Sequence, residues 1–322
     1  MTFSEALAII NEEIQSIEYP HNYSNLYEPI AYILALKGKK VRPALTLLAC
    51  NMYSDDVKEA IHAALAWEIF HNFTLMHDDV MDKADIRRGQ ATVHKKWDEN
   101  TAILSGDAML ILSYKYMSKS SSENLKILLE LFSDTAAKIC EGQQFDMEFE
   151  KRMNISEGDY IEMIKLKTAV MLGACLKSGA IVGGANENDR DNLYDFGINL
   201  GIAFQIKDDW LDVYGNPEIF GKKIGGDIIC NKKTFLLVKA LETAKGEEKK
   251  ELLHWLNISS EPDKKISAIR QLYNKLSIDK ITQVELQKYY TQAINALNNV
   301  SVETKRKKAL EDIARELIGR EN

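Results

Sequence analysis

Two copies of an aspartate-rich pattern, DDxxD, carry the clearest chemical signal in this sequence. The copies lie at residues 78–82 (DDVMD) and 208–212 (DDWLD), each at the end of a long apolar run with helical spacing. Positions i and i+4 of an α-helix share one face, so the first and last aspartates of each copy form a carboxylate pair. The sequence therefore predicts two places at which paired carboxylates could bind a cation.

The position of these carboxylate pairs at helix ends is better explained by a bound cation than by chance. Like charges at i and i+4 destabilise a helix, and carboxylates near its C-terminus oppose the helix dipole. Mg²⁺ prefers hard oxygen ligands and usually takes one or two carboxylates, several waters and substrate phosphates. The alternative is that both patterns are simply acidic helix ends in contact with solvent. The occurrence of two copies, each within an otherwise apolar helix, disfavours this alternative.

Clusters of lysine and arginine accompany both aspartate copies. The loop KGKKVRP (37–43) enters a predicted helix near Pro43, where exposed backbone amides suit a diphosphate. Further basic pairs are Arg87-Arg88, Lys222-Lys223 and Lys232-Lys233. A single such pair is usually solvated surface, but their recurrence beside the aspartates predicts a site for two polyanionic groups.

The composition indicates a folded, mildly acidic protein. Of the 322 residues, 45% are apolar, which is enough for a core and argues against global disorder. Lysine and arginine number 41 against 48 aspartates and glutamates, a formal charge of −7. This balance argues against a nucleic-acid partner, but it permits a locally basic or metal-loaded site.

No membrane span and no secretion signal are expected. No run of about 18 apolar residues occurs, and the N-terminal residues lack the cationic and apolar regions of a signal peptide. The four cysteines form no CxxC pair and stand apart, at positions 50, 140, 175 and 230. We interpret them as reduced thiols in a cytoplasmic protein.

The apolar periodicity predicts an all-α protein of about ten or more helices, and no alternating strand pattern bounded by Asn-Gly or Asp-Gly is visible. The clearest periodic stretches are 57–81, 100–116, 125–149, 160–182 and 192–213, and residues 214–231 form the longest irregular stretch. No Ser/Pro-rich linker and no short repeat divides the chain, so a single domain over residues 1–322 is expected.

Taken together, these motifs resemble the trans-isoprenyl (polyprenyl) diphosphate synthase family, which includes farnesyl and geranylgeranyl diphosphate synthases. The matching segments are GKKVRP (38–43), FHNFTLMHDDVMD (70–82), RRGQATVH (87–94), AILSGDAML (102–110), KTAVML (167–172), FQIKDDWLD (204–212) and GKKIGGDIICNKKT (221–234). Three positions depart from the family pattern: Lys37 and Asn231 replace glycines, and Lys40 replaces an arginine. The resemblance implies a bundle of long helices around a deep central cavity, usually as a homodimer.

The resemblance also implies residue roles at the metal and allylic sites. Asp78, Asp82 and Asp208 would bind three Mg²⁺ ions that bridge to the allylic diphosphate, and it stays open whether Asp79 and Asp212 are direct ligands. The residues that would hold this diphosphate are Arg87, Lys167 and one of Lys222 or Lys223, with Lys232 nearby. Family members place the lysine of the 222–223 pair four or five residues before the aspartate that matches Asp227, and the usual bacterial spacing of five selects Lys222.

A second group of residues would bind the diphosphate of isopentenyl diphosphate. By resemblance these are Lys39, Arg42, His71 and Arg88. Helix geometry agrees for His71, which lies seven residues before Asp78 and therefore about 20° from its face and two turns away. Thr168 and Gln205 would turn oxygens toward the developing allylic cation, although ordinary polar contacts between helices would also explain them.

The implied reaction joins isopentenyl diphosphate to an allylic diphosphate, whether dimethylallyl, geranyl or farnesyl diphosphate. Mg²⁺ and basic side chains would neutralise the leaving diphosphate, and the double bond of isopentenyl diphosphate would attack the allylic cation. Proton loss, to the departing diphosphate, would give a trans product five carbons longer. No Ser/His/Asp or Cys nucleophile is needed, but water must be excluded.

Two other functions fit parts of the pattern. Class I terpene cyclases and head-to-head condensing enzymes also ionise allylic diphosphates on Mg²⁺, but they usually lack the GKxxRP loop and a second complete DDxxD. A non-catalytic helical subunit of a heteromeric synthase would tend to lose an aspartate cluster, and both clusters are intact here.

Residues just before Asp78 predict the product length. The growing chain would descend along the 57–82 helix past Phe73 and Phe70, which lie roughly 7.5 and 12 Å along the axis, whereas Trp67 is expected to pack in the core. Thr74 is small where animal-type farnesyl synthases carry an aromatic residue, and the two-residue insertion of bacterial farnesyl enzymes is missing. The pattern predicts mainly a C20 product, with C15 next, and products beyond C25 are not expected.

Overall fold

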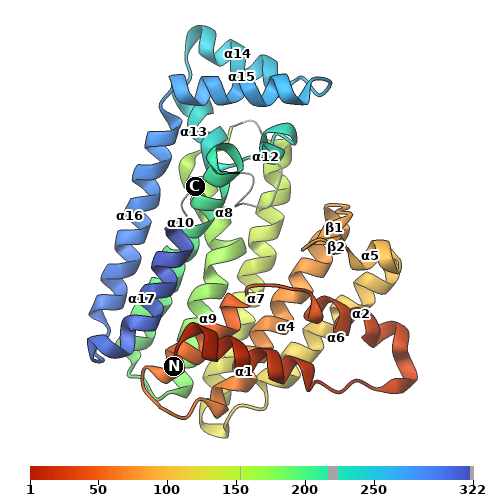
Figure 1. Ribbon diagram of the computed structural model, residues 1–322, viewed down its shortest axis with the longest axis vertical. Coiled ribbons are helices and arrows are strands. Elements are labelled where there is room, and N and C mark those ends of the chain that lie inside the picture. The colour runs from red at the N-terminus through yellow and green to blue at the C-terminus, as the bar shows by residue number, and fades with distance from the viewer. Residues whose placement is uncertain (153, 217–223, 320–322) are drawn as a thin grey trace. The chain divides into compact units, whose positions relative to one another are not determined.

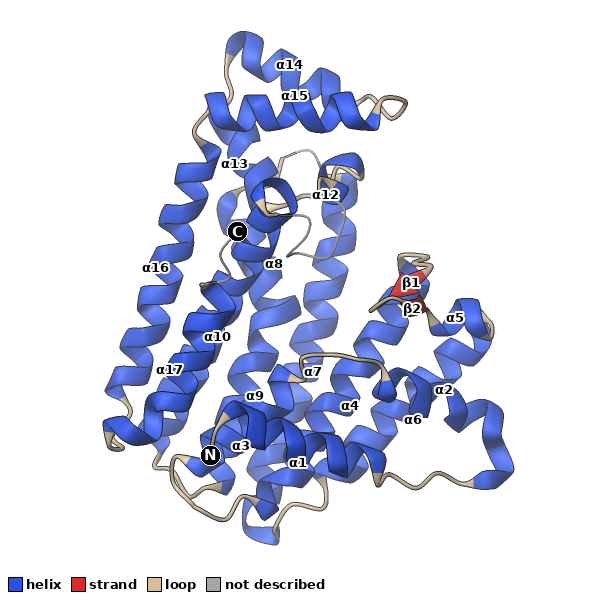
Figure 2. Ribbon diagram, in the orientation of Figure 1, coloured by secondary structure: helices blue, strands red, loops and turns tan. Residues whose placement is uncertain are grey.

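The protein is almost entirely helical. The computed structural model describes residues 1–152, 154–216 and 224–319, and 79% of the chain is helix. The only strands in these ranges are the short pair β1 (Ile86–Arg87) and β2 (Gln90–Ala91), drawn in red in Figure 2. The prediction of an all-α protein with ten or more helices is confirmed.

Contacts along the chain define two compact units. Unit 1 comprises Met1–Asp134, Ala174–Tyr194 and Val300–Leu310, and unit 2 comprises Thr135–Gly173, Asp195–Asn299 and Glu311–Asn322. Four helices contribute residues to both units: α7 (Ser122–Lys151), α9 (Val170–Val182), α10 (Glu187–Tyr214) and α17 (Thr304–Ile318). The single domain over residues 1–322 stays a prediction.

Unit 1 is built around α4 (Lys58–Met81), the helix that ends in the first aspartate cluster (Figure 1). Its buried face carries four alanines, at positions 60, 63, 64 and 66, and these small side chains let α3 (Val41–Asn51) and α6 (Glu99–Met117) pack closely against it. The other elements of unit 1 are α1 (Phe3–Gln15), η1 (His21–Tyr23), α2 (Ser24–Ala35) and α5 (Val93–Lys96).

An aromatic cluster fills the core of unit 1 beneath the first aspartates. Phe132 of α7 contacts two rings of α4, with centroids 4.7 Å from Trp67 and 5.2 Å from Phe70. The Trp67 indole donates a hydrogen bond to Ser178 Oγ at 3.0 Å, and Trp67 is fully buried. Trp67 is therefore a core residue, as expected.

Unit 2 packs a set of helices around α10 and α13 (Phe235–Thr243). Its core includes Tyr160, Ile206, Phe235 and Tyr273, all buried. The remaining elements are α8 (Glu157–Ile164), a π-helical turn η2 (Lys165–Ala169), α12 (Gly226–Ile229), α14 (Gly246–Leu256), α15 (Pro262–Lys275) and α16 (Ile278–Asn299).

Most long periodic stretches form single helices close to their predicted bounds, but three details differ. The stretch 160–182 is interrupted by the π-helical turn η2, and the irregular stretch 214–231 contains the short helix α12. The strand pair β1–β2 was not expected, because two-residue strands are too short to show alternation. Lys222 and Lys223 lie outside the described residues.

Candidate active site

The first aspartate cluster lies where α4 ends. Lys83 adopts a left-handed conformation, with φ of 53°, and the amides of Lys83 and Ala84 bond back to the carbonyls of Val80 and Asp79. This pairing closes the helix in a Schellman-type cap. Asp78 is half-buried, Asp79 is buried and Asp82 is exposed at the helix end.

Asp79 is bound by Arg87. The Arg87 Nε lies 2.8 and 2.9 Å from the two Asp79 carboxylate oxygens, and Nη2 lies 2.7 Å from Oδ1. Such a charge-assisted, multidentate contact fixes both side chains. Asp79 therefore orients Arg87, and its carboxylate is already neutralised by the protein.

The strand pair β1–β2 separates two neighbouring arginines. Arg87 is paired with Gln90 in the ribbon, and Arg88 and Gly89 form the turn with φ of 52° and 76°. Positive φ at both turn residues is the signature of a type I′ hairpin turn. The guanidinium of Arg88 lies over Gly38, where a Cβ would come within 2.7 Å of Arg88 Cζ.

Arg42 and His71 meet at the same end of unit 1. Arg42 Nη1 lies 3.2 Å from His71 Nε2, and because arginine can only donate, His71 Nε2 must be the acceptor. His71 is therefore neutral, with its proton on Nδ1. Lys40 precedes α3 in a left-handed conformation, φ of 43°, so the loop that carries the exposed Lys39 turns sharply into the helix bearing Arg42.

Burial and neighbouring charges shift the pKa values of the residues in this basic group. Burial lowers the pKa of Arg42 and of Arg88, and burial also raises the pKa of the Glu68 carboxyl, which accepts a hydrogen bond from Asn72 at 3.0 Å. The pKa of His71 is lowered well below 6.5, first by burial and then by the positive charges of Arg42, Arg88 and Arg87. A site with this much positive potential suits an anion.

The depressed His71 pKa predicts a pH dependence of stability. Below pH 6.5 the unfolded chain protonates His71 and the folded protein does not, so this residue makes the free energy of unfolding fall as pH decreases toward the folded pKa. We expect H71Q to remove up to about 1.4 kcal/mol per pH unit of that fall. Urea unfolding between pH 7.5 and 5.5 measures it, and parallel pH profiles for the two proteins would contradict it.

In unit 2, Lys167 and Thr168 lie on the π-helical turn η2. Lys167 Nζ lies 2.6 Å from Asp146 of α7, and its side chain is 27% exposed. α7 approaches so closely that a Cβ at Gly142 would lie 2.4 Å from the Lys167 backbone nitrogen. A π-helical turn shifts the register of a helix locally and is frequent at functional sites, so it explains how Lys167 and Thr168 share one opening.

The second aspartate cluster lies near the end of α10, where Asp209 and Asp212 each accept hydrogen bonds from other segments. Asp209 is buried and accepts hydrogen bonds from Tyr160 Oη at 2.5 Å and from the Phe235 amide at 2.8 Å. Asp212 Oδ2 accepts the amide of Asp227, at the start of α12, at 3.1 Å. Asp208 is the most exposed of the three.

A small cavity in unit 2 brings several predicted residues together. Its volume is about 80 Å³, and its lining includes Lys167, Thr168, Gln205, Asp209 and Lys232. Gln205 Nε2 donates to Asp209 Oδ1 at 3.3 Å, which leaves the Gln205 carbonyl oxygen as an acceptor. With Lys233, the cavity therefore combines three lysines and two carboxylates, Asp146 and Asp209, with the neutral oxygens of Thr168 and Gln205. The lysines suit an anion, and the oxygens suit positive charge beside it.

Sequence reasoning missed several residues of this cavity, among them Asp146 and Tyr160. Asp146 lies four residues after Gly142 on one face of α7, and a GxxxD pattern ahead of the KT pair is a signal that could have found it. Tyr160, which fixes Asp209, has no local signal. Within the ranges that the structure describes, no helix is both long and apolar enough to span a bilayer.

Comparisons with known proteins identify the family. The model of the polyprenyl synthetase family matches residues 23–276. The geranylgeranyl diphosphate synthase of Sulfolobus acidocaldarius is 37% identical over 303 residues, 93% of this chain and 91% of that protein.

Two solved structures agree. A crystal structure of a geranylgeranyl pyrophosphate synthase superposes with a TM-score of 0.95 at 42% identity over all of both chains. The geranylgeranyl pyrophosphate synthetase from Pyrococcus horikoshii gives a TM-score of 0.92 at 31% identity, over 99% of this chain and 97% of that one. The chain therefore belongs to the polyprenyl synthetase family and is a trans-prenyltransferase.

Proposed function

We propose that the protein condenses isopentenyl diphosphate head to tail with an allylic diphosphate, releases diphosphate and makes mainly geranylgeranyl diphosphate. One observation carries the proposal: each aspartate cluster has its own cationic side chains, Arg87 beside the first and Lys232 beside the second, and a separate basic group surrounds Arg42. This arrangement offers separate cationic groups to two anionic substrates, and the geranylgeranyl synthases among the relatives support the product.

We propose Mg²⁺ as the metal, with Asp78, Asp82 and Asp208 as its ligands and about three ions bound with the substrate. Carboxylate oxygens fit a hard cation. Asp79 and Asp212 bind protein groups and would position the clusters. Within the described ranges no three acidic, histidine or cysteine side chains lie close enough to hold an ion alone. That fits an ion completed by phosphate oxygens and water, and the metal when bound supplies charge neutralisation to the leaving diphosphate.

The allylic diphosphate would be held by Arg87, Lys167 and Lys232, with Lys222 as the predicted fourth group. Lys167 would exchange its contact with Asp146 for phosphate oxygens, and Asp79 would keep Arg87 aimed. These contacts strengthen as negative charge develops on the leaving group, so they lower the barrier to C–O cleavage.

The second substrate would be bound by Arg42, Arg88, Lys39 and His71. Arg42 and Arg88 are pre-organised by their contacts with His71 and Gly38, which reduces the cost of ordering them on binding. Thr168 and the Gln205 carbonyl oxygen would face the allylic carbons and favour positive charge there. Attack by the double bond and loss of a proton to the departing diphosphate complete the reaction.

Product length would be set by the rings that precede Asp78 on α4. The Phe73 ring is partly buried, and its centroid lies 5.4 Å from Phe70 and 4.8 Å from His77. Thr74 turns its hydroxyl back to the His71 carbonyl, at 2.8 Å. Below Phe73, Phe70 and Phe132 close the packing.

Replacing Phe73 with alanine should lengthen the product by one or more five-carbon units. The change removes a ring that is not locked in the core, whereas Phe70 is almost fully buried and packed against Phe132. Chromatography of the dephosphorylated products measures the length, and Trp67→Phe, a change in the core only, is the control. An unchanged product would mean that another residue, with Phe70 the first candidate, ends the chain.

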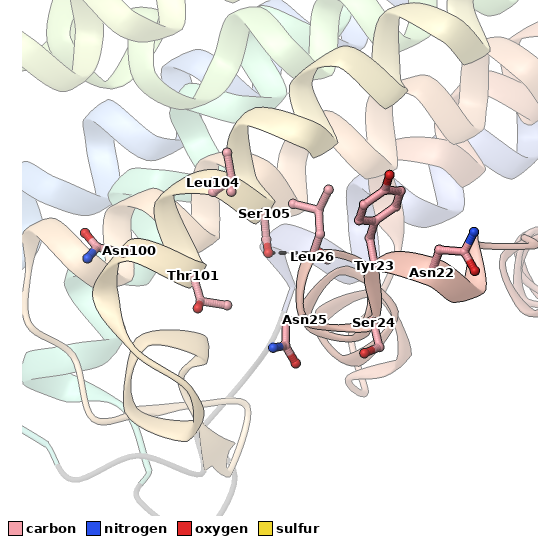
Figure 3. Close-up of a pocket in the computed structure, with 9 residues that line it drawn as sticks. All are labelled: Asn22, Tyr23, Ser24, Asn25, Leu26, Asn100, Thr101, Leu104 and Ser105. Carbon is pink, nitrogen blue, oxygen red and sulfur yellow. Dashed lines mark hydrogen bonds between the residues drawn. The ribbon is translucent and has the colours of Figure 1, made fainter.

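A homodimer is the proposed assembly. Helix α6 exposes three large apolar side chains on one face, Ile103, Leu104 and Ile111, and Leu104 is 60% exposed. Beside them an open groove of about 500 Å³ is lined by Tyr23, Leu26 and Leu104 (Figure 3). An apolar helix face of this kind favours burial against a second copy, and sedimentation should give twice the mass of one chain.

We place the protein in the cytoplasm. Its four cysteines are free thiols, two of them exposed, which suits a reducing compartment.

The proposed function is tested by diphosphate release from farnesyl diphosphate with and without isopentenyl diphosphate. Condensation requires both substrates and stops when a chelator removes Mg²⁺. Release from farnesyl diphosphate alone would indicate a cyclase or head-to-head enzyme, and no release with any allylic diphosphate would indicate a non-catalytic subunit.

A further inference from the structure

The segment that carries Lys232 has an unusual residue before it. Asn231 follows α12 in a left-handed conformation, φ of 55°, with its amide bonded to the Ile228 carbonyl and the Lys232 amide bonded to the Asp227 carbonyl. These two bonds form a Schellman cap, in which the left-handed position usually carries glycine. The family pattern also has glycine at this position. What the asparagine adds is therefore the set of contacts that its side chain makes.

The Asn231 side chain ties this cap to helices α14 and α15. Its Nδ2 donates to the Leu256 carbonyl, the last of α14, at 2.8 Å. Its Oδ1 accepts from Lys265 Nζ of α15 at 2.6 Å. Glycine would make neither bond.

Lys265 is a buried lysine whose three donors all have acceptors in this region. The residue is only 2% exposed, and besides Asn231 its Nζ donates to the Ile258 carbonyl at 3.1 Å and the Ile229 carbonyl at 3.3 Å. A buried ammonium is costly unless its hydrogen bonds are made. The arrangement therefore holds the end of α12 firmly against the α14–α15 connection.

The position of Lys232 depends on this anchor. Its Nζ lies 3.7 Å from Asp227 Oδ1, and its backbone is held on one side by Asn231 and on the other by the Thr234 amide, which bonds to the Lys232 carbonyl at 2.8 Å. Lys232 lines the cavity that also contains Lys167 and Thr168. A shift of the cap would move the Lys232 ammonium relative to that cavity.

We propose that Asn231 and Lys265 form a positioning pair that fixes Lys232 for the allylic diphosphate. The inference rests on the proposed function only in naming the ligand of Lys232. The pair acts through the backbone of residues 229–232 and does not touch the substrate.

The test uses Asn231→Gly, which keeps the left-handed backbone at no steric cost and removes only the two side-chain bonds. We expect it to weaken binding of geranyl thiolodiphosphate, measured by calorimetry with Mg²⁺, about tenfold, and to raise the KM for geranyl diphosphate by a similar factor. The KM for isopentenyl diphosphate should stay within about twofold, a change too small to reflect a lost contact. If Asn231 only stabilised the fold, its loss would change the KM values for the two substrates alike.

Lys265→Met and the double variant show whether the two residues act together. If they form one unit, the double variant should bind the analogue no more weakly than Lys265→Met alone. The control is Lys239→Met, which removes a lysine of α13 paired with Glu157 and Glu242 away from the cap and should bind as the wild type does.

The proposed positioning pair would be overturned if Asn231→Gly bound the analogue as tightly as the wild type. It would also be overturned if the losses of affinity in the two single variants added up in the double variant. A wild-type protein that binds the analogue but forms no product would overturn the proposed function instead, because the binding measurement does not depend on turnover.

Discussion

Replacing Asp208 with alanine should lower kcat by about a thousandfold or more while the protein stays folded. Asp208 is the most exposed carboxylate of the second cluster, because Asp209 and Asp212 are both buried. Loss of a metal ligand removes stabilisation of the leaving diphosphate, which is the largest electrostatic contribution to this chemistry. Steady-state kinetics with saturating Mg²⁺ measures the loss, and D78A should behave alike.

The control for this prediction is Asp191→Ala on the same helix. Asp191 forms a surface ion pair with Lys177 at 2.6 Å, and such pairs contribute little to stability. Its kcat should equal that of the wild type. If D208A or D78A keeps more than about a tenth of wild-type activity, a cost of only ~1.4 kcal/mol, that residue is not a metal ligand.

Arg42→Ala and Arg87→Ala should damage the use of different substrates. Arg42 lies with His71, so its loss should raise the KM for isopentenyl diphosphate by roughly ten- to a hundredfold with a smaller change in kcat. Arg87 would contact the leaving group, so its loss should lower kcat and the kcat/KM for the allylic substrate. It also leaves the Asp79 carboxylate without its arginine partner, which makes the loss larger.

Full kinetics with each substrate varied in turn separates the two variants. Arg306→Ala, which removes an exposed ion pair with Asp55, is the matched arginine control and should leave both KM values unchanged. An identical defect in R42A and R87A would show that the division into two diphosphate sites is wrong.

The aspartate clusters and the long helices could be predicted because both depend on local spacing. Helical period identified α4 and α10, and the DDxxD pattern marked their ends, since i and i+4 share a face in any helix. That Asp79 pairs with an arginine, unlike the proposed ligands Asp78 and Asp82, could not be predicted. It depends on Arg87 reaching back from a two-residue strand whose turn is set by Arg88 and Gly89.

Contacts between distant segments explain the rest of what the sequence did not reveal. The π-helical turn at Lys167 arises where α7 passes close at Gly142, and no local pattern in residues 165–169 signals it. The bond between Lys265 and Asn231 joins residues far apart in the chain. From the sequence, Asn231 was only a position at which the family pattern has glycine. Its proposed role depends on Lys265, which belongs to no recognisable sequence motif.

The mass and geometry of the product formed from isopentenyl diphosphate and farnesyl diphosphate with Mg²⁺ test the central claim most directly. Head-to-tail condensation predicts a linear, all-trans C20 diphosphate, identified as geranylgeraniol after dephosphorylation, with one diphosphate released for each isopentenyl diphosphate consumed. A cyclic hydrocarbon, a head-to-head C30 product, or no product from any allylic diphosphate would contradict it.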